Sequence, residues 1–275
     1  MLGFRKHSTR PPQDGVHPGA ADQCRDLYLA LLKRSLLGLT YEDDSNLYPV
    51  SMGEAPGRVS HDAKLRVEGA DWPVKAPTMI GVERLENIQR CIESVLVDAV
   101  PGDLIETGVW RGGAVIFMRG VLKAYGVTDR TVWVADSFEG FPSPNGAKYP
   151  HDAGLHLEQY RELAVSLEEV QRNFERYQLL DQQVRFLKGW FRDTLGQAPI
   201  QKLALLRLDG DLYESTTDAL TNLYARVSRG GYVIIDDYFP FPACRQAVHD
   251  FRDAQGIRDP IVPIDKQGAF WRRST

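Results

Sequence analysis

From Pro101 onward, the chain alternates short apolar runs with longer amphipathic stretches. The segments centred on apolar residues are 103–107, 131–135, 184–187, 203–208 and 232–235, and the amphipathic stretches include 113–125, 215–227 and 243–254. Short apolar runs bounded by glycine, proline and acidic residues are typical of buried strands, and the stretches between them have the period of helices. Five such units with short connections predict an α/β fold, a doubly wound parallel sheet with helices on both faces.

The N-terminal part of the chain has a different pattern. Residues 1–20 contain proline, glycine and histidine without periodicity, which predicts a flexible tail. A helical pattern begins at Asp22, whereas residues 40–75 are irregular and predict loops with one short strand at most. We therefore expect residues 21–77 to form a partly helical N-terminal extension or cap.

The main domain is expected over residues 78–275. It should begin with a helix from Thr78 to about Ala99, whose apolar residues share one face. Residues 261–264 and 268–272 flank a turn and predict a hairpin that closes the sheet.

Composition excludes several classes of protein. The 33 basic and 37 acidic residues give a net charge of −4, which argues against a nucleic-acid partner, because such a partner needs a concentrated basic face. No apolar run approaches 18 residues, so no membrane-spanning segment is expected. The three cysteines are odd in number and scattered, as free thiols in a reducing compartment would be. We expect a cytoplasmic protein.

Two acidic clusters follow two of the predicted strands. Asp209 and Asp211 come after 203–208, and Asp236 and Asp237 come directly after the next strand. The carboxyl ends of parallel strands meet at one edge of the sheet, where open α/β sheets bind their ligands. Carboxylates gathered there repel one another unless a cation lies between them, and an all-oxygen ligand set favours Mg²⁺. The sequence thus predicts a metal site.

A glycine turn follows the first predicted strand. Gly108 permits a tight reversal under a ligand, and Gly112 and Gly113 remove side chains from the start of the next helix. The turn lacks the dinucleotide-binding spacing Gly-x-Gly-x-x-Gly. Glu106 beside the turn suits a cationic sulfonium or ammonium better than a pyrophosphate.

Asp136 ends the second predicted strand, at the place where an acid can accept both hydroxyls of a ribose. Its alternative role is to cap the following turn. With the glycine turn it predicts a nucleoside site. The long polar loop 139–155 follows, and we expect it to be a lid over a substrate or a surface excursion. Tyr48, Met52 and Trp72 are further candidates to line the pocket.

Together these residues resemble the macrocin O-methyltransferase family, over about the last 70% of the chain. The most specific segments are 106–113, 136–142, 188–191, 208–213 and 230–238. The resemblance implies a homo-oligomeric enzyme that transfers a methyl group from S-adenosylmethionine to a hydroxyl of an antibiotic deoxysugar. It also implies the class I methyltransferase sheet, with seven strands and the last one antiparallel.

The resemblance implies roles for individual residues. The metal ligands would be Asp209, Asp236 and Asp237. Asp211 would be the general base, with two alternatives: a capping or additional-ligand role for Asp211, or Asp209 as both ligand and base. The cofactor would contact Thr78, Met79, Glu106, Thr107, Gly108, Trp110, Arg111, Gly112, Gly113, Asp136, Ser137, Phe138, Asp181, Gln182, Gly189, Trp190, Phe191 and Asp209.

The sequence leaves three other functions open. A metal-dependent methyltransferase of a catechol or another phenol is the nearest, because a catechol chelates Mg²⁺ as well as a sugar diol does. A nicotinamide oxidoreductase would need the Gly-x-Gly-x-x-Gly and Tyr-x-x-x-Lys motifs, which are missing. A non-catalytic scaffold would be expected to have lost acids that this chain keeps.

Overall fold

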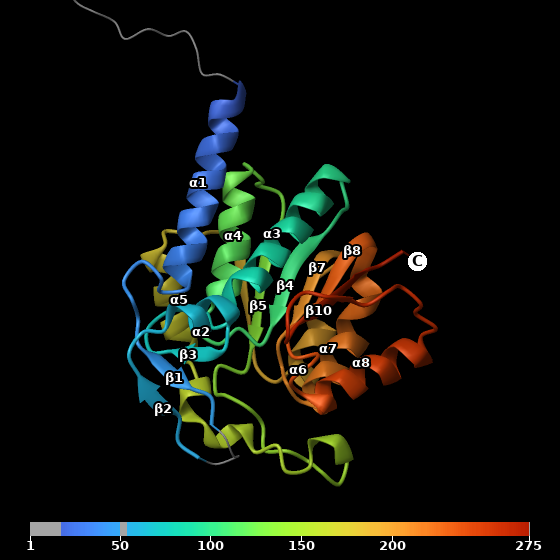
Figure 1. Ribbon diagram of the computed structural model, residues 1–275. Coiled ribbons are helices and arrows are strands. Elements are labelled where there is room, and N and C mark those ends of the chain that lie inside the picture. The colour runs from blue at the N-terminus through green and yellow to red at the C-terminus, as the bar shows by residue number, and fades with distance from the viewer. Residues whose placement is uncertain (1–17, 50–53, 275) are drawn as a thin grey trace, which may run out of the picture.

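The computed structural model describes residues 18–49 and 54–274, and its centre is a seven-stranded sheet (Figure 1). The strand order is β6-β5-β4-β7-β8-β10-β9. The strands are β4 (Asp103–Thr107), β5 (Val132–Asp136), β6 (Val184–Lys188), β7 (Leu203–Leu208), β8 (Val227–Ile235), β9 (Val262–Pro263) and β10 (Ala269–Arg272). Strands β4 to β8 are parallel, and β10, the last in the chain, is antiparallel to β8. The predicted doubly wound fold is confirmed.

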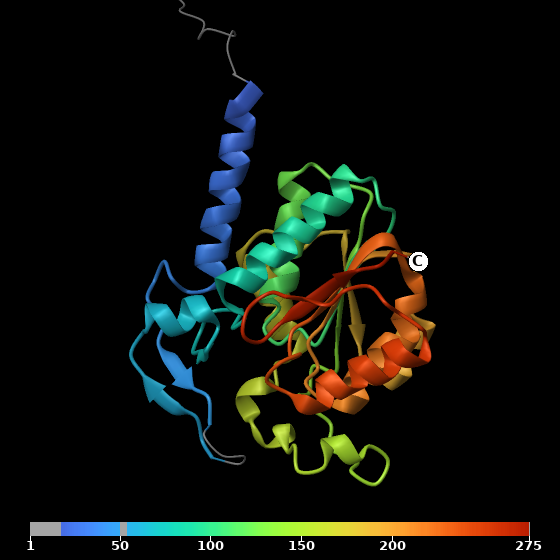
Figure 2. The same cartoon turned by 45° about the vertical axis from the view of Figure 1, so that its right-hand side comes forward.

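Helices cover both faces of this sheet (Figures 1 and 2). One group comprises α1 (Pro18–Leu36), α3 (Gly81–Val97), α4 (Gly113–Ala124) and α5 (Leu167–Arg176), and the other comprises α6 (Phe191–Thr194), α7 (Tyr213–Leu223) and α8 (Pro242–Ala254). Because neighbouring side chains on a strand point to opposite faces, Leu104 joins the first hydrophobic core and Ile105 the second. Among the described residues, no helix is long and apolar enough to cross a membrane.

The N-terminal extension is more ordered than the sequence suggested. Residues 40–75 were expected to be loops, but they form a three-stranded antiparallel sheet in the order β2-β1-β3 and one helix. These elements are β1 (Ser45–Leu47), β2 (Gly57–Val59), α2 (Ala63–Glu68) and β3 (Asp71–Pro73). The tail expected over 1–20 lies outside the described residues, except for residues 18–20, which begin α1.

Arg66 explains why this extension folds. Its side chain is fully buried and its guanidinium donates to the carboxylate of Asp71 over 2.8–3.1 Å. It also donates to the carbonyls of Leu37 and Asp43, at 2.8 and 3.1 Å. Buried backbone carbonyls need such donors, so one arginine joins the end of α1 to α2 and β3. These contacts span up to 29 residues of sequence, which a local pattern does not reveal.

The segment 139–163 crosses the carboxyl edge of the sheet. It contains three short 3₁₀ turns, at Pro150–Asp152, Leu157–Gln159 and Arg161–Leu163. The buried carboxylate of Asp152 accepts hydrogen bonds from the amides of Tyr213 and Glu214, at 2.6 and 3.0 Å. This cap explains why α7 begins at Tyr213, two residues earlier than expected, because it satisfies two amides of the first turn.

Candidate active site

The candidate site lies at the carboxyl edge of the sheet, where β4 and β7 are neighbours. The chain proceeds from β4 toward β6 on one side and from β7 toward β10 on the other, so this is the topological switch point. Thr107 pairs with Leu208, and Leu208 pairs with Ile235, which places the residues after the three strands at one level. A cavity of about 430 Å³ lies there.

Gly108 makes the close approach of β4 and β7 possible. Its φ is +85°, in the left-handed region, and a Cβ on it would lie 1.7 Å from the carbonyl oxygen of Asp209. Any side chain at this position would therefore displace the backbone that carries the acidic cluster. The glycine is required by the contact between the two strand ends.

Ten of the residues expected to contact the cofactor line the cavity. They are Thr78, Met79, Glu106, Gly108, Trp110, Asp136, Ser137, Trp190, Phe191 and Asp209. Eight are absent from the cavity lining: Thr107, Arg111, Gly112, Gly113, Phe138, Asp181, Gln182 and Gly189. For Asp181 the structure gives another partner, since its carboxylate accepts a 2.6 Å hydrogen bond from Arg119.

Gly113 and Arg111 do not line the cavity but support one of its walls. A Cβ on Gly113 would lie 2.5 Å from the carbonyl oxygen of Pro77, whose oxygen also accepts a 2.8 Å hydrogen bond from the Gly113 amide. Arg111 donates to the carbonyls of Pro73 and Ala76, at 2.9 and 3.2 Å. These contacts hold the segment before α3 against the start of α4, and so bring Thr78 into the cavity wall.

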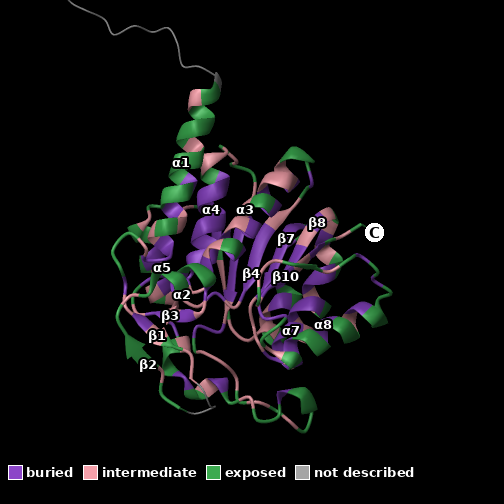
Figure 3. Cartoon of the chain, in the orientation of Figure 1, coloured by how far each residue is buried: buried purple, intermediate pink, exposed green. Residues whose placement is uncertain are grey.

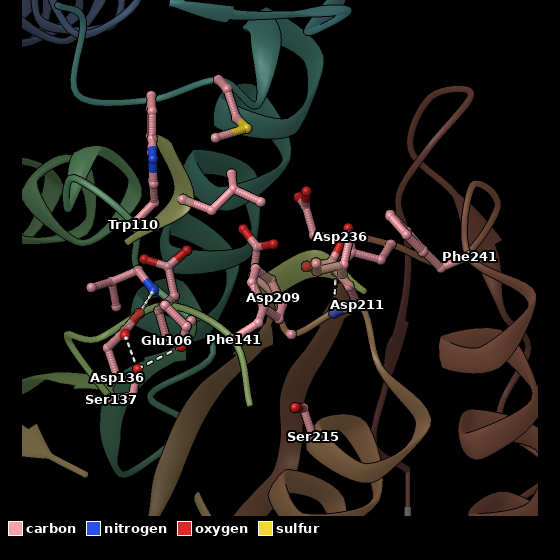
Figure 4. Close-up of a pocket in the computed structure, with 18 of the residues that line it drawn as sticks. Glu106, Trp110, Asp136, Ser137, Phe141, Asp209, Asp211, Ser215, Asp236 and Phe241 are labelled. Carbon is pink, nitrogen blue, oxygen red and sulfur yellow. Dashed lines mark hydrogen bonds between the residues drawn. The ribbon is translucent and has the colours of Figure 1, made fainter. Parts of the chain in front are cut away.

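Asp136 is bound to the glycine turn. One carboxylate oxygen accepts from the amide of Val109 at 2.7 Å, and the other accepts from the amide of Phe138 at 2.8 Å (Figure 4). Burial raises the pKa of Asp136, and these backbone donors oppose the shift. Ser137 Oγ also donates to the oxygen that Phe138 binds, at 3.4 Å, so the predicted ribose contact would need the other oxygen, the one that accepts from Val109.

The acids at the ends of β7 and β8 form a cluster. Carboxylate oxygens of Asp209, Asp211 and Asp237 all lie within 4.8 Å of one another. Burial and then the charge of Asp209 raise the pKa of Asp211 to about 8, and burial and then the charge of Asp236 raise that of Asp209 to about 6. Burial also raises the pKa of Asp237 well above its usual value. Three negative charges this close together repel one another strongly, and a cation bound between them would remove the repulsion.

Asp211 has an unusual backbone conformation within this cluster. Its φ is +54°, and its amide donates a 3.1 Å hydrogen bond to the carboxylate of Asp237. A residue other than glycine rarely adopts this region, although aspartate tolerates it better than most. The turn thereby aims the side chain of Asp211 at the same cavity as that of Asp209 (Figure 4).

Asp236 has different surroundings from its neighbour. One of its oxygens is paired with Arg84 and the other with Arg207, and both arginines are buried. Arg207 also pairs with Glu106 and lies 2.8 Å from the carboxylate of Asp209. Of the three expected metal ligands, the structure thus brings two into the cluster within 4.8 Å, together with Asp211, and places Asp236 in an arginine network beside them.

An aromatic wall closes the outer side of the cavity. The ring centroid of Trp72 lies 5.6 Å from that of Tyr48 and 5.6 Å from that of Tyr160, and all three side chains line the cavity. Phe141 and Phe241 continue the wall. The N-terminal extension and the 139–163 segment therefore meet over the site. Met52, the third pocket candidate from the extension, lies outside the described residues.

Neither Arg207 nor Arg84 was expected at the site from the sequence. Arg207 interrupts the otherwise apolar run of β7, every residue of which is buried. A charged side chain in a fully buried strand needs a charged partner, so this interruption was a usable signal for the network. Arg84 carries no such signal, because it lies on an amphipathic helix 152 residues away from Asp236.

Comparison with known proteins agrees with this geometry. A family model described as macrocin-O-methyltransferase (TylF) matches residues 25–273. Mycinamicin III 3''-O-methyltransferase of Micromonospora griseorubida is 55% identical over 255 residues, which cover 90% of this chain and 97% of that protein. A second relative is the 8-demethyl-8-(2,3-dimethoxy-alpha-L-rhamnosyl)-tetracenomycin-C 4'-O-methyltransferase of Streptomyces olivaceus. It is 56% identical over 254 residues, which cover 92% of this chain and 95% of that protein.

A solved O-methyltransferase structure has the same fold. The O-methyltransferase NovP superposes with a TM-score of 0.84 at 53% identity, covering 91% of this chain and 100% of that one. With the family match over nearly the whole described chain, the sequence and the fold lead to one conclusion: this protein belongs to the macrocin-O-methyltransferase family.

Proposed function

We propose that the enzyme transfers a methyl group from S-adenosylmethionine to a hydroxyl of a deoxysugar on a glycosylated natural product, with the help of a bound divalent cation such as Mg²⁺. The observation that carries the proposal is the juxtaposition of two features. The Asp209, Asp211 and Asp237 cluster lies in the same cavity as the glycine turn at Gly108 and the acid Asp136.

The cavity fits S-adenosylmethionine. Gly108 leaves the turn free of side chains, and one oxygen of Asp136 offers a lone pair to a ribose. Glu106 Oε2 is buried and has no hydrogen-bond partner among the described residues, although the side chain lines the cavity. Burial raises the pKa of this carboxyl to about 8, and a cationic ligand group, such as the amino or sulfonium group of the cofactor, would favour its anionic form.

The acidic cluster fits a hard divalent cation. We propose Asp209 and Asp237 as ligands, since both belong to the cluster and both have raised pKa values when it holds no cation. Asp236 stays a proposed third ligand. Each of its oxygens has a lone pair besides the one facing an arginine, so it could bind a cation without leaving the network.

When bound, S-adenosylmethionine supplies an electrophilic methyl group, and a divalent cation lowers the pKa of a hydroxyl that it binds. Asp211 is the proposed general base, which takes the proton from the acceptor hydroxyl onto a carboxylate oxygen. Its position among the other acids raises its affinity for a proton. Arg207 pairs with Glu106, which would face the cofactor, and with Asp209, which would face the acceptor. It thereby holds these two carboxylates in fixed positions relative to each other.

The aromatic wall supports a substrate with a large apolar part. Trp72, Tyr160 and Phe141 would pack against an aglycone while the sugar reaches the acids. The relative from Streptomyces olivaceus is named for a rhamnosyl compound, which favours a sugar hydroxyl over the alternative, the hydroxyl of a catechol or other phenol. We also propose a homo-oligomer in the cytoplasm, where the free thiols of Cys24, Cys91 and Cys244 would persist.

The test is an acceptor screen. The purified enzyme is incubated with S-adenosylmethionine and Mg²⁺, together with glycosylated macrolides, glycosylated polyketides or simple catechols, and products are identified by mass spectrometry. The proposal expects the gain of one methyl group on the sugar of a glycoside, located by fragmentation. Methylation of catechols with no glycoside converted would support the alternative and contradict the sugar assignment.

A further inference from the structure

The 139–163 segment is attached to the body of the protein through a buried carboxylate. Most of the segment is exposed or half-buried, as Figure 3 shows, and its buried residues within 139–163 are Asp152, Leu157 and Tyr160. Leu157 and Tyr160 line the cavity. Asp152 does not line it, yet its side chain is fully buried. Because a buried carboxylate is costly without hydrogen bonds, its partners show what the burial achieves.

The partners of Asp152 are the first two amides of α7. One carboxylate oxygen accepts from the amide of Tyr213 at 2.6 Å, and the other accepts from the amide of Glu214 at 3.0 Å. The residue directly before α7 is Leu212, whose side chain cannot accept a hydrogen bond. Helix α2, in contrast, is capped by Asp62 directly before it. The start of α7 thus depends on a carboxylate 61 residues earlier in the chain.

The turn before α7 carries Asp211 and is held at three points. On its upstream side, the amide of Asp209 donates to the carbonyl of Thr107 at the end of β4, at 2.9 Å. At Asp211 itself, the amide donates to the carboxylate of Asp237 at 3.1 Å. On the downstream side, Asp152 binds the amides two and three residues after Asp211. The φ of Asp211 is +54°, and such a conformation persists only where the surrounding contacts enforce it.

A second contact joins the same part of the segment to α7. The ring of His151 stacks on that of Tyr213, with the ring centroids 5.2 Å apart and the planes at 24°. The hydroxyl of Tyr213 donates to the carboxylate of Asp250 on α8 at 2.9 Å. The 139–163 segment also supplies Phe141 and Tyr160 to the cavity wall. The segment that would contact the acceptor is therefore the one that holds the start of α7.

We propose that Asp152 is a positioning residue for Asp211, an inference that rests on the proposed function of Asp211 as general base. By binding the first two amides of α7, Asp152 fixes the downstream side of the turn and keeps the carboxylate of Asp211 in place for the acceptor hydroxyl. This makes the placement of Asp211 depend on the position of the 139–163 segment. A displacement of about 1 Å at a catalytic group can lower a rate by about 10²-fold.

Asp152→Asn tests the proposal with little change of shape. Its side-chain amide has one acceptor oxygen, so one of the two α7 amides loses its partner. With saturating S-adenosylmethionine, Mg²⁺ and the glycoside converted in the acceptor screen, kcat should fall by about 10–10²-fold. Hydrogen exchange followed by mass spectrometry, which needs no acceptor, should show faster exchange within 209–214 than in wild type. Unchanged exchange there would overturn the proposal.

A double-mutant cycle separates positioning of the base from a merely structural role. If Asp152 acts through Asp211, adding Asp152→Asn to Asp211→Asn should leave the already reduced kcat unchanged, whereas independent effects would multiply. Asp62→Ala is the matched control, because Asp62 also accepts from two helix amides, at 2.9 and 3.1 Å, but caps α2. It should lower the melting temperature and keep the kcat of wild type.

The outcomes distinguish this proposal from the proposed function on which it depends. A wild-type kcat in Asp152→Asn, the same fold-loss in the Asp211→Asn background, or an equal loss in Asp62→Ala would overturn the positioning role alone. A wild-type kcat in Asp211→Asn would instead remove the proposed base, and with it the group that Asp152 is inferred to position.

Discussion

Two adjacent carboxylates at the end of β8 have opposite electrostatic surroundings. Asp236 is paired with Arg84 and Arg207, and so its charge is compensated within the protein. Asp237 faces two other acids, and the backbone amide of Asp211 donates to it. The uncompensated negative charge of the site is therefore concentrated on the side of Asp237, which is where we expect a cation to bind.

The proposed base can be tested by Asp211→Asn. This change keeps the shape of the side chain but removes its capacity to accept a proton, so kcat should fall by about 10²–10⁴-fold. The affinity for S-adenosylmethionine, measured by calorimetry, should stay within a few-fold of wild type. Asp193→Asn is the control, because Asp193 is an exposed aspartate and its replacement should leave kcat unchanged. A kcat near that of wild type for Asp211→Asn would exclude Asp211 as the base.

The raised pKa values predict how pH and metal affect stability. An acid whose pKa is about 4 when unfolded and is raised when folded stabilises the protonated native state at low pH, and this contribution is lost as pH rises through the folded pKa. For the metal-free protein the loss should extend from about pH 4 to about pH 8, the value for Asp211. Cation binding removes the repulsion but must displace these protons.

Mg²⁺ should therefore raise the melting temperature more at pH 8 than at pH 5. Differential scanning calorimetry with EDTA and with excess Mg²⁺ at both pH values gives the comparison. Asp211→Asn should show a smaller dependence of metal-free stability on pH than wild type. An equal effect of Mg²⁺ at both pH values would contradict the assignment of the cluster as the binding site.

Gly108→Ala tests the glycine turn. The added methyl group would lie 1.7 Å from the carbonyl oxygen of Asp209, so the two strand ends must move apart, and cofactor affinity should be lost. Gly126→Ala is a matched control, because Gly126 also has a positive φ of +67° but a Cβ there meets no atom within 4 Å. It should cost about 1–2 kcal/mol of stability and retain cofactor binding. Equal cofactor affinity in the two variants would show that the contact is unimportant.

At the scale of elements, the sequence predicted the parts whose information is local. Strand 203–208 is apolar except for Arg207, and the acids that follow it, Asp209 and Asp211, lie at the sheet edge as expected. The N-terminal sheet was missed, because β1, β2 and β3 have three residues each and depend on the buried Arg66. The pairing of Asp236 with Arg84 was missed for the same reason, since both depend on contacts between distant segments.

The stability of the extension should depend on Arg66. Arg66→Ala leaves Asp71 buried without its cation, which typically costs about 3–5 kcal/mol. We expect loss of the ordered extension, seen as rapid proteolysis within 40–75 and a lower unfolding free energy in urea. Arg58→Ala is the control, since Arg58 pairs with Asp44 at the surface and should cost about 0.2–1 kcal/mol. Similar losses for the two variants would contradict the role given to Arg66.

At the scale of the whole molecule, different segments of the chain form different sides of the cavity. The ends of β4 and β5 form the side of the cavity with the glycine turn and Asp136, and the ends of β7 and β8 form the acidic side. The N-terminal extension and the 139–163 segment supply most of the aromatic wall, and Phe241, from the segment after β8, completes it. The strand ends of the sheet fix the cofactor side and the acidic side of the cavity, whereas connecting segments form the aromatic wall. We therefore expect substitutions in the wall to change substrate preference without changing the reaction.

Cation binding by the acids after β7 and β8 is central to the proposed mechanism. Titration of the metal-free protein with Mn²⁺, followed by electron paramagnetic resonance of the free ion, measures it without any substrate. Wild type should bind one ion per chain, competitively with Mg²⁺, and Asp209→Ala and Asp237→Ala should lose that site, with S-adenosylmethionine affinity kept in Asp237→Ala. Mn²⁺ binding of the same stoichiometry and affinity in either variant, or full turnover of wild type in EDTA, would contradict it.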